Sequence, residues 1–350
     1  MISFARVVKM AAVASALAAT GCTATTADSL PALKADVSKQ TVSGLSSGGY
    51  MAGQFQIANS SRVFGAGIVA AGPFGCAMSA GAKAIPFFPA ALALNTAQAQ
   101  NGCMADYLSS LGVLDAKRLL AQARKLADAG SIDPLSNLKA SKIYLYSGAN
   151  DSTVALAVVK AARDFYLAAG VPEANIDFVS GGPGGHAFST AMAGNACETT
   201  EPPFVNNCKY DQAEAILRFL YGSLEPKGTA AEADFTVFDQ RRYASSDATM
   251  ADDGVVYVPP ACREGGCRVH VVFHGCRQTR ALVGDAVTKG SGFADWAATN
   301  RLIVLFPQVE ASSANPRACW DWWGYTGLDF LTKNAPQMKA VSAMVDALGK

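Results

Sequence analysis

The sequence reads Gly44-Leu45-Ser46-Ser47-Gly48-Gly49 between an expected strand at residues 37–43 and an expected helix at residues 50–60. A strand, a sharp glycine-rich turn and a helix form the context in which a G-x-S-x-G nucleophile elbow presents a serine. The glycines have a physical role there, because the serine sits in a strained turn and small neighbours let the flanking elements approach closely. The motif alone is common by chance, so a plain glycine- and serine-rich loop is the competing interpretation.

Two further residues follow expected core strands in the order that a serine hydrolase of the α/β-hydrolase type requires. Asp151 follows an apolar segment at residues 142–146, and His186 lies on a glycine-rich loop after the next strand, at residues 176–179. The order serine, aspartate, histidine belongs to this fold, whereas two other serine triads use different orders. The sequence therefore predicts Ser46 as nucleophile, His186 as base and Asp151 as the residue that orients the imidazole. A turn residue and a polar loop residue are the simpler alternatives for Asp151 and His186.

The chain contains only three histidines, and a serine nucleophile needs one of them as its base. His270 lies within the expected strand at residues 268–273, where alternation places it on a face of the sheet. His274 opens the turn His274-Gly275-Cys276 directly after that strand. Such a His-Gly turn supplies the second backbone N–H of an oxyanion hole. His186 is therefore the base by elimination as well as by position.

The position of the His-Gly turn is unusual, since in an ordinary α/β-hydrolase it precedes the elbow by several strands. The residues around it resemble the beginning of such a fold, with a hairpin at residues 235–238 and 254–259 and core strands at residues 269–273 and 302–307. A circular permutation explains this order and is physically tolerable, because the termini of a domain often lie close together. The rival interpretation is two domains with a break near residues 222–231.

We favour the permutation because neither half alone carries both the triad and the oxyanion turn. The predicted fold is a permuted α/β-hydrolase with a mainly parallel central sheet and helices on both faces. It forms a single catalytic domain over residues 28–350, and the protein is expected to be a monomer.

The N-terminus is typical of an export signal. Arg6 and Lys9 precede an apolar run at residues 10–19 that is too short to span a bilayer, and small residues follow it. We predict a signal peptide at residues 1–27 and a secreted protein, extracellular or periplasmic. The alternative is a lipoprotein signal at residues 1–21, which would leave Cys22 as a lipid-anchored N-terminus.

The cysteine count agrees with export. Nine cysteines occur, and removal or lipidation of Cys22 leaves eight, an even number in an oxidising compartment. Proximity in the sequence favours the pairs Cys197–Cys208 and Cys262–Cys267, whereas the other pairings stay open. Buried free thiols are the alternative that parity does not exclude.

Composition limits the classes of ligand. The formal net charge is +1 and 16% of the residues are charged, so no basic stripe indicates nucleic acid as a partner. The cysteine spacings are not those of zinc sites, and we expect neither a metal nor a cofactor.

Together these residues resemble the circularly permuted, single-domain extracellular poly(3-hydroxybutyrate) depolymerases of the fungal type. The likeness rests on residues 44–51, on the Asn150-Asp151 loop and His186, on the turn at residues 274–278, and on residues 319–323, Cys-Trp-Asp-Trp-Trp. It implies the triad Ser46, Asp151 and His186, and an oxyanion hole formed by the backbone N–H groups of Ser47 and Cys276. It also implies that Cys276 is disulfide-bonded near the site.

The implied substrate is an aliphatic polyester or its oligomers, bound at the surface of the catalytic domain itself. The alternative is a secreted feruloyl- or acetylxylan-type carboxylesterase, which uses similar His-Gly-Cys and Cys-Trp-x-Trp segments. The permuted order speaks against that alternative.

Two apolar segments are candidates for contact with a polyester chain. We predict Trp320 and Trp323 as substrate-binding residues, although core packing is the simpler interpretation for part of this cluster. Adjacent Trp322 and Trp323 cannot both face inward on a regular strand, which favours Trp323 as the exposed one. The segment at residues 85–89, Ile-Pro-Phe-Phe-Pro, is a second candidate, with a buried loop as its alternative.

Overall fold

The computed structural model of the chain describes residues 29–79 and 81–350. The predicted signal peptide at residues 1–27 and the predicted lipidation site Cys22 lie outside the described residues. Within those ranges, the model contains no helix with the length and hydropathy needed to cross a membrane.

Strands from both halves of the chain form one eight-stranded sheet with the order β4-β3-β2-β1-β10-β11-β9-β8. Neighbours from β4 to β11 run parallel, whereas β9 is antiparallel to both β11 and β8. The strands are β1 (Asp36–Leu45), β2 (Val63–Val69), β3 (Lys142–Gly148), β4 (Ile176–Gly182), β8 (Phe235–Asp239), β9 (Asp253–Tyr257), β10 (Arg268–Phe273) and β11 (Leu302–Phe306). The mainly parallel sheet confirms the expected α/β class.

The two halves meet at β1 and β10, in the middle of the sheet. The register pairs Gly44 with Phe273, so both strands end at the same level. The residues that follow are Ser46 on one strand and His274 on the other, and they therefore emerge at one edge of the sheet. The permutation hypothesis requires this adjacency, and the two-domain interpretation does not provide it.

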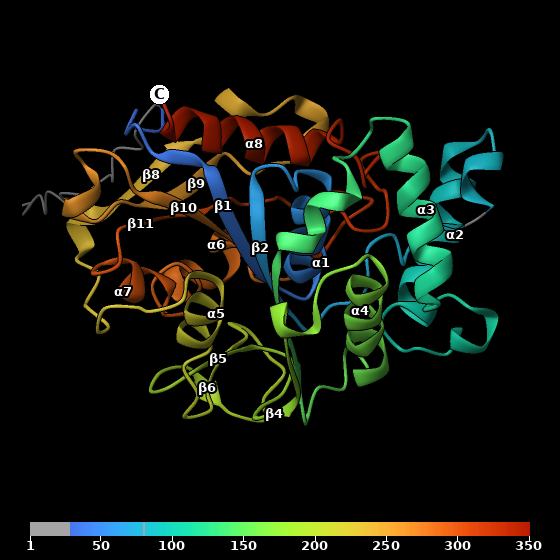
Figure 1. Ribbon diagram of the computed structural model, residues 1–350, viewed down its shortest axis with the longest axis horizontal. Helices are drawn as coiled ribbons and strands as arrows, with labels where there is room; N and C mark the ends of the chain where they lie inside the picture. The colour runs from blue at the N-terminus through green and yellow to red at the C-terminus, as the bar shows by residue number, and fades with distance from the viewer. Residues whose placement is uncertain (1–28, 80) are drawn as a thin grey trace, which may run out of the picture.

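Helices cover both faces of the sheet (Figure 1). Side chains of β10 alternate between the faces: Val269 and Val271 belong to the core beneath α1, α4 and α8, and Val272 belongs to the core beneath α5 and α7. The helices are α1 (Ser47–Ala58), α2 (Phe88–Gly102), α3 (Ala116–Asp128), α4 (Leu156–Ala168), α5 (Gln212–Tyr221), α6 (Arg280–Val283), α7 (Phe293–Ala297) and α8 (Pro336–Leu348). A small second sheet contains β5 (Phe188–Thr190), β6 (Asn195–Ala196) and β7 (Val205–Asn207).

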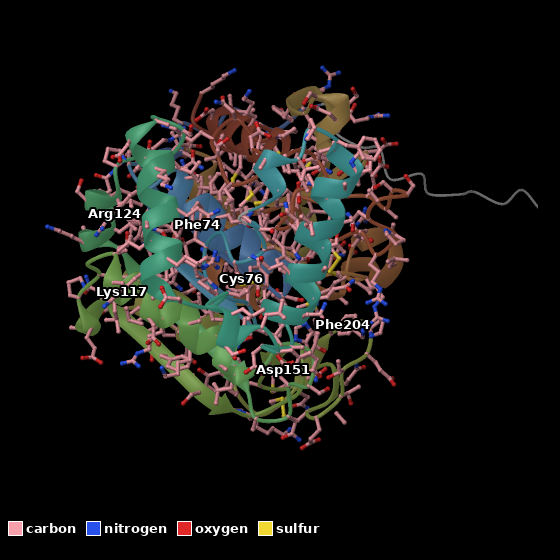
Figure 2. All side chains as sticks on the ribbon, turned by 90° about the vertical axis from the view of Figure 1, so that its right-hand side faces the viewer. Phe74, Cys76, Lys117, Arg124, Asp151 and Phe204 are labelled. Atoms are coloured by element: carbon pink, nitrogen blue, oxygen red, sulfur yellow. A yellow bond between two sulfur atoms is a disulfide. The ribbon has the colours of Figure 1, made fainter. Side chains whose placement is uncertain are left out.

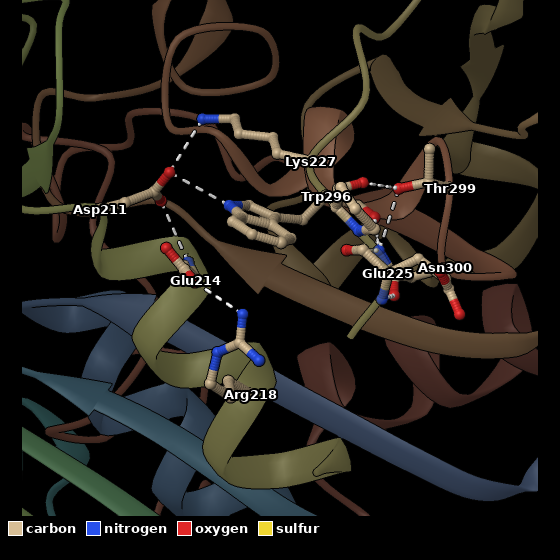
Figure 3. A network of polar contacts seen from close by, with 9 residues as sticks. Asp211, Glu214, Arg218, Glu225, Lys227, Trp296, Thr299 and Asn300 are labelled. Carbon is tan, nitrogen blue, oxygen red and sulfur yellow. Dashed lines mark hydrogen bonds and ion pairs between the residues drawn. The ribbon is translucent and has the colours of Figure 1, made fainter. Parts of the chain in front are cut away.

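The segment that connects the two halves is bound to both of them (Figure 3). Lys227 forms an ion pair of 2.9 Å with Asp211, which precedes α5. The same carboxylate accepts a hydrogen bond of 3.1 Å from the indole N–H of Trp296 on α7. The Asn300 side chain holds Glu225 by accepting from its backbone N–H and donating to its carbonyl oxygen. Residues 222–231 therefore lie along the protein surface in fixed contact with both halves.

All eight described cysteines form disulfides. The pairs Cys197–Cys208 and Cys262–Cys267 are confirmed. The other two bridges, which the sequence left open, are Cys76–Cys103 and Cys276–Cys319.

Candidate active site

Ser46 occupies a strained turn between β1 and α1. Its φ is 58° and its ψ is −120°, a conformation that costs free energy for a residue with a side chain. Gly48 permits this turn: a Cβ atom there would lie 2.3 Å from the carbonyl oxygen of Phe273 and 2.4 Å from that of His274. Only glycine lets α1 approach the end of β10 so closely. The expected elbow geometry is therefore present, and α1 begins at Ser47, three residues earlier than expected.

Asp151 orients the imidazole of His186. The distance from Asp151 Oδ2 to His186 Nδ1 is 2.9 Å, and the two side chains are only 1% and 6% exposed. The other carboxylate oxygen accepts hydrogen bonds from the backbone N–H groups of Thr153 and Val154, at 2.8 and 3.0 Å. Because Nδ1 is engaged with the carboxylate, Nε2 is the ring nitrogen that lies outside this contact.

The loops after β4 are held in place around this pair. The backbone N–H of His186 donates to Thr200 Oγ1, and the backbone N–H of Gly185 donates to the carbonyl oxygen of Cys197. Cys197 is joined by a disulfide to Cys208, which directly follows β7, so the segment that accepts the hydrogen bond from Gly185 is itself held covalently.

Ser46, His186 and Cys276 line one cavity of about 70 Å³. The turn after β10 touches the serine directly, since a Cβ atom built on Gly275 would lie 3.6 Å from Ser46 Cβ. Within the described ranges the backbone N–H of Cys276 has no hydrogen-bond acceptor. Ser47 is the first residue of α1, and the N–H groups at the start of a helix have no intrahelical acceptor. Both predicted oxyanion donors are thus available, and the positive end of the α1 dipole favours negative charge beside them.

The other two histidines are enclosed in the core. His270 Nδ1 is 2.6 Å from Thr41 Oγ1 and Nε2 is 2.6 Å from Ser43 Oγ, and burial lowers the pKa of His270 to about 3. His274 Nδ1 donates to the carbonyl oxygen of Gly275, and burial lowers the pKa of His274 to about 4. Both imidazoles are neutral at neutral pH, and only His186 of the three lines the serine's cavity.

A larger, apolar cavity of about 390 Å³ adjoins the first one. Its wall includes Met104, Trp322 and Trp323, and Cys276 and Arg317 line both cavities. The Cys276–Cys319 disulfide forms part of this wall. A chain of neutral ester units would find there the apolar surroundings that suit an aliphatic ligand.

Asp321 shapes the turn that carries the two tryptophans. Its carboxylate is buried and accepts hydrogen bonds from four backbone N–H groups and one hydroxyl, all within residues 323–326. Burial raises the pKa of the Asp321 carboxyl above its ordinary value, and these hydrogen bonds oppose that shift. Trp322 stacks on Tyr50 with ring centroids 4.0 Å apart, which fixes the apolar wall against α1.

One prediction about the tryptophans needs correction. Trp320 is fully buried and packs against Phe273 and His274, so it has no surface to offer to a substrate. Trp323 is the more exposed of the adjacent pair, as expected, and both Trp322 and Trp323 line the apolar cavity because Asp321 makes the segment a turn. The substrate-binding prediction for Trp323 agrees with this position.

Several residues that line the serine's cavity were not singled out from the sequence. Thr153 and Thr200 are two of them, and the other four are Met104, Phe204, Arg277 and Arg317. Of these residues, Phe204 is labelled in Figure 2, together with the triad candidate Asp151. Two of the four had a signal in the sequence: Arg277 directly follows Cys276, and Arg317 stands two residues before Cys319. Met104 and Phe204 reach the cavity through tertiary contacts alone.

Known proteins resemble this chain over most of its length, although no protein-family model matches it. It is 39% identical over 323 residues to a poly(3-hydroxybutyrate) depolymerase of Delftia acidovorans, a match that covers 91% of this chain and 61% of that protein. The chain thus corresponds to less than two thirds of the Delftia protein. It is 30% identical over 347 residues to a polyhydroxybutyrate depolymerase of Talaromyces funiculosus, covering 94% of this chain and 95% of the relative.

Solved structures agree with the sequence matches. The PHB depolymerase of Penicillium funiculosum superposes with a TM-score of 0.77 at 28% identity, covering 91% of this chain and 98% of that one. A serine-to-alanine variant of a PHB depolymerase, solved in complex with an R3HB trimer, matches with the same values. The α/β-hydrolase fold is thereby confirmed, and the chain belongs to the polyhydroxybutyrate depolymerase family.

Proposed function

We propose that the chain is a secreted serine esterase that hydrolyses the ester bonds of poly(3-hydroxybutyrate) or its oligomers through an acyl-enzyme on Ser46. One observation carries the proposal: Ser46, His186 and Cys276, which are remote in sequence, line one cavity next to an apolar cavity. Family membership supports the substrate class, and four disulfides support an oxidising compartment. Lipidation at Cys22 and a monomeric state remain predictions.

In the first half of the reaction, Ser46 Oγ forms a bond to the ester carbonyl carbon while His186 Nε2 takes the hydroxyl proton. The oxyanion that develops is bound by the backbone N–H groups of Ser47 and Cys276. The carbon–oxygen bond to the alcohol portion then breaks, and the departing oxygen receives the proton from His186.

In the second half, a water molecule attacks the acyl-enzyme as His186 accepts one of its protons. The bond from the carbonyl carbon to Ser46 Oγ breaks, and the serine recovers its proton from the imidazolium. The products are one carboxylic acid and one alcohol for each ester, and no external oxidant or cofactor enters the balance. Asp151 keeps the imidazole of His186 in one orientation through both halves of the reaction.

Contact with a solid polymer needs an exposed apolar surface near the cavity. Phe87, Phe88 and Leu94 are 65%, 40% and 42% exposed, and they lie on α2 or at its start. The same helix lines the apolar cavity through Thr96 and Ala99. The segment at residues 85–89 is therefore an exposed apolar patch beside the substrate's path, and we assign polymer adsorption to it.

A substrate comparison tests the proposed function. The purified protein should erode a poly(3-hydroxybutyrate) film and release hydroxy acids from 3-hydroxybutyrate oligomers, with little turnover of methyl ferulate or acetylated xylan. Turnover of the feruloyl or acetyl substrates, with no release from either hydroxybutyrate substrate, would contradict the assignment and favour the carboxylesterase alternative.

A further inference from the structure

Two arginines line the serine's cavity without a carboxylate partner. Arg277 and Arg317 are both exposed, and neither takes part in an ion pair within the described ranges. Six other arginines of the described ranges form ion pairs with carboxylates: Arg62, Arg163, Arg218, Arg241, Arg263 and Arg280. Two uncompensated positive charges at one small cavity indicate a ligand with a negative charge.

The backbone holds the two arginines together at the cavity. Arg277 directly follows the proposed oxyanion donor Cys276 and has a φ of 57°, which is a strained value for a residue with a side chain. Its backbone N–H donates to the carbonyl oxygen of Arg317 at 2.7 Å. Its guanidinium carbon lies 5.2 Å from the ring centroid of Phe204, which lines the same cavity. This cation–π contact keeps the charged group at the cavity wall.

The two neighbouring cavities differ in chemistry. The larger one has an apolar wall that includes Trp322 and Trp323, which suits uncharged ester units, whereas Met104 lines both cavities. Arg317 lines both cavities, and Arg277 lines only the one that holds Ser46. The ester units inside a polyester chain are uncharged, and a guanidinium binds them no more strongly than it binds water. The acid end of an oligomer has such a group, because its carboxyl is ionised at neutral pH.

We propose that Arg277 and Arg317 bind the terminal carboxylate of 3-hydroxybutyrate oligomers and so direct hydrolysis to an ester near the acid end. The inference rests on the proposed function. A guanidinium binds a carboxylate with two parallel hydrogen bonds, which fixes position as well as charge. In a 3-hydroxybutyrate oligomer the acid end lies on the alcohol side of every ester, so a carboxylate held beside Ser46 belongs to the alcohol portion of the scissile ester. The released product is then a short hydroxy acid.

The test compares a 3-hydroxybutyrate trimer as free acid with the same trimer as methyl ester. We expect kcat/KM of the wild type to be about tenfold higher for the acid than for the methyl ester. One or two charge-assisted hydrogen bonds at a partly exposed site have an effect of about this size. In the Arg277→Gln, Arg317→Gln double variant the ratio of kcat/KM for the acid to kcat/KM for the methyl ester should fall to about one. Arg277→Lys should retain part of the preference, because the charge remains and the paired hydrogen bonds do not.

Arg280→Gln is the matched control. Arg280 stands in the same turn region, is paired with Asp285 at 2.7 Å and lines a separate cavity. Its variant should keep the wild-type preference. Methyl ester turnover also reports that each variant is folded.

Three results would contradict the inference: equal rates on acid and methyl ester in the wild type, a preference that survives the double substitution, or a proportional loss of both activities in the double variant. A wild-type protein that hydrolyses neither trimer would refute the proposed function itself.

Discussion

The turn at Gly275 lies against Ser46: a Cβ atom added to Gly275 would stand 3.6 Å from the Cβ of Ser46. The two residues come from opposite halves of the chain and meet because β1 and β10 are neighbours in the sheet with Gly44 paired to Phe273. The proposed nucleophile Ser46 and the turn that carries the proposed oxyanion donor Cys276 are thus positioned by one strand pair.

Gly275→Ala should lower kcat while leaving the fold intact. The added methyl group would lie 3.3 Å from the carbonyl oxygen of Leu45 and from Gln278 Oε1, so the turn must shift by a few tenths of an ångström. Displacement of the Cys276 N–H should reduce kcat by up to about 10²-fold, since loss of an oxyanion donor costs about 10²–10³-fold. Steady-state kinetics on a soluble oligomer measure this. Gly81→Ala is the control, because its added methyl group would meet only Leu94, at 3.8 Å. Equal kcat in the two variants would count against the role of the turn.

Removal of the Cys276–Cys319 bridge should destabilise the protein more than removal of Cys262–Cys267. The sequence separations are 43 and 5 residues, and the loop-entropy model predicts a difference of about 2 kcal/mol in the free energy of unfolding. Paired Cys→Ser variants, unfolded in urea, test this. The Cys276–Cys319 variant should also lose activity, because that bridge holds the oxyanion turn against the tryptophan segment. Unchanged activity would show that the turn keeps its geometry without the bridge.

Stability should fall as the pH drops below about 6.5. Burial lowers the folded-state pKa of His270 to about 3 and that of His274 to about 4 from the ordinary 6.5. Between pH 6.5 and pH 5 the unfolded state binds protons that the folded state does not. Each buried imidazole therefore lowers the free energy of unfolding by up to about 2 kcal/mol over this range. A His270→Asn variant should show a shallower loss over this range in urea unfolding. Parallel pH profiles for wild type and variant would contradict the account.

Substitution of Phe87 and Phe88 by serine should weaken action on polymer film and leave oligomer turnover unchanged. Both rings are exposed at the start of α2, outside the serine's cavity. Binding to polymer granules should fall by about 30-fold, because two apolar contacts of about 1 kcal/mol each are lost. Leu282→Ser is the control, since Leu282 is 63% exposed but lines a different cavity. An equal effect of both variants would mean that adsorption is not specific to the α2 patch.

The sequence predicted the core strands well, because they depend on local signals. The strand that ends at Gly44 and the strand that ends at Phe273 are apolar runs followed by glycine-containing turns. The start of α1 was placed too late, because Gly48 and Gly49 are poor helix formers. Close packing of Gly48 against the end of β10 outweighs that propensity.

Other features depend on contacts that no local pattern encodes. The bridge Cys276–Cys319 joins residues that come together only when the sheet and the Asp321 turn have formed. No local pattern shows that the buried Asp321 carboxylate makes its segment a turn, which brings both Trp322 and Trp323 to the apolar cavity.

The most direct test of the account is the site of covalent modification by a serine-directed fluorophosphonate, mapped by peptide mass spectrometry and followed by activity on a 3-hydroxybutyrate oligomer. The account predicts one modified residue, Ser46, with activity lost in proportion to labelling. It also predicts no labelling in Ser46→Ala, whose kcat should fall by about 10⁵–10⁶-fold. Labelling at another serine, or oligomer hydrolysis that persists in Ser46→Ala, would contradict the assignment of the nucleophile and the mechanism built on it.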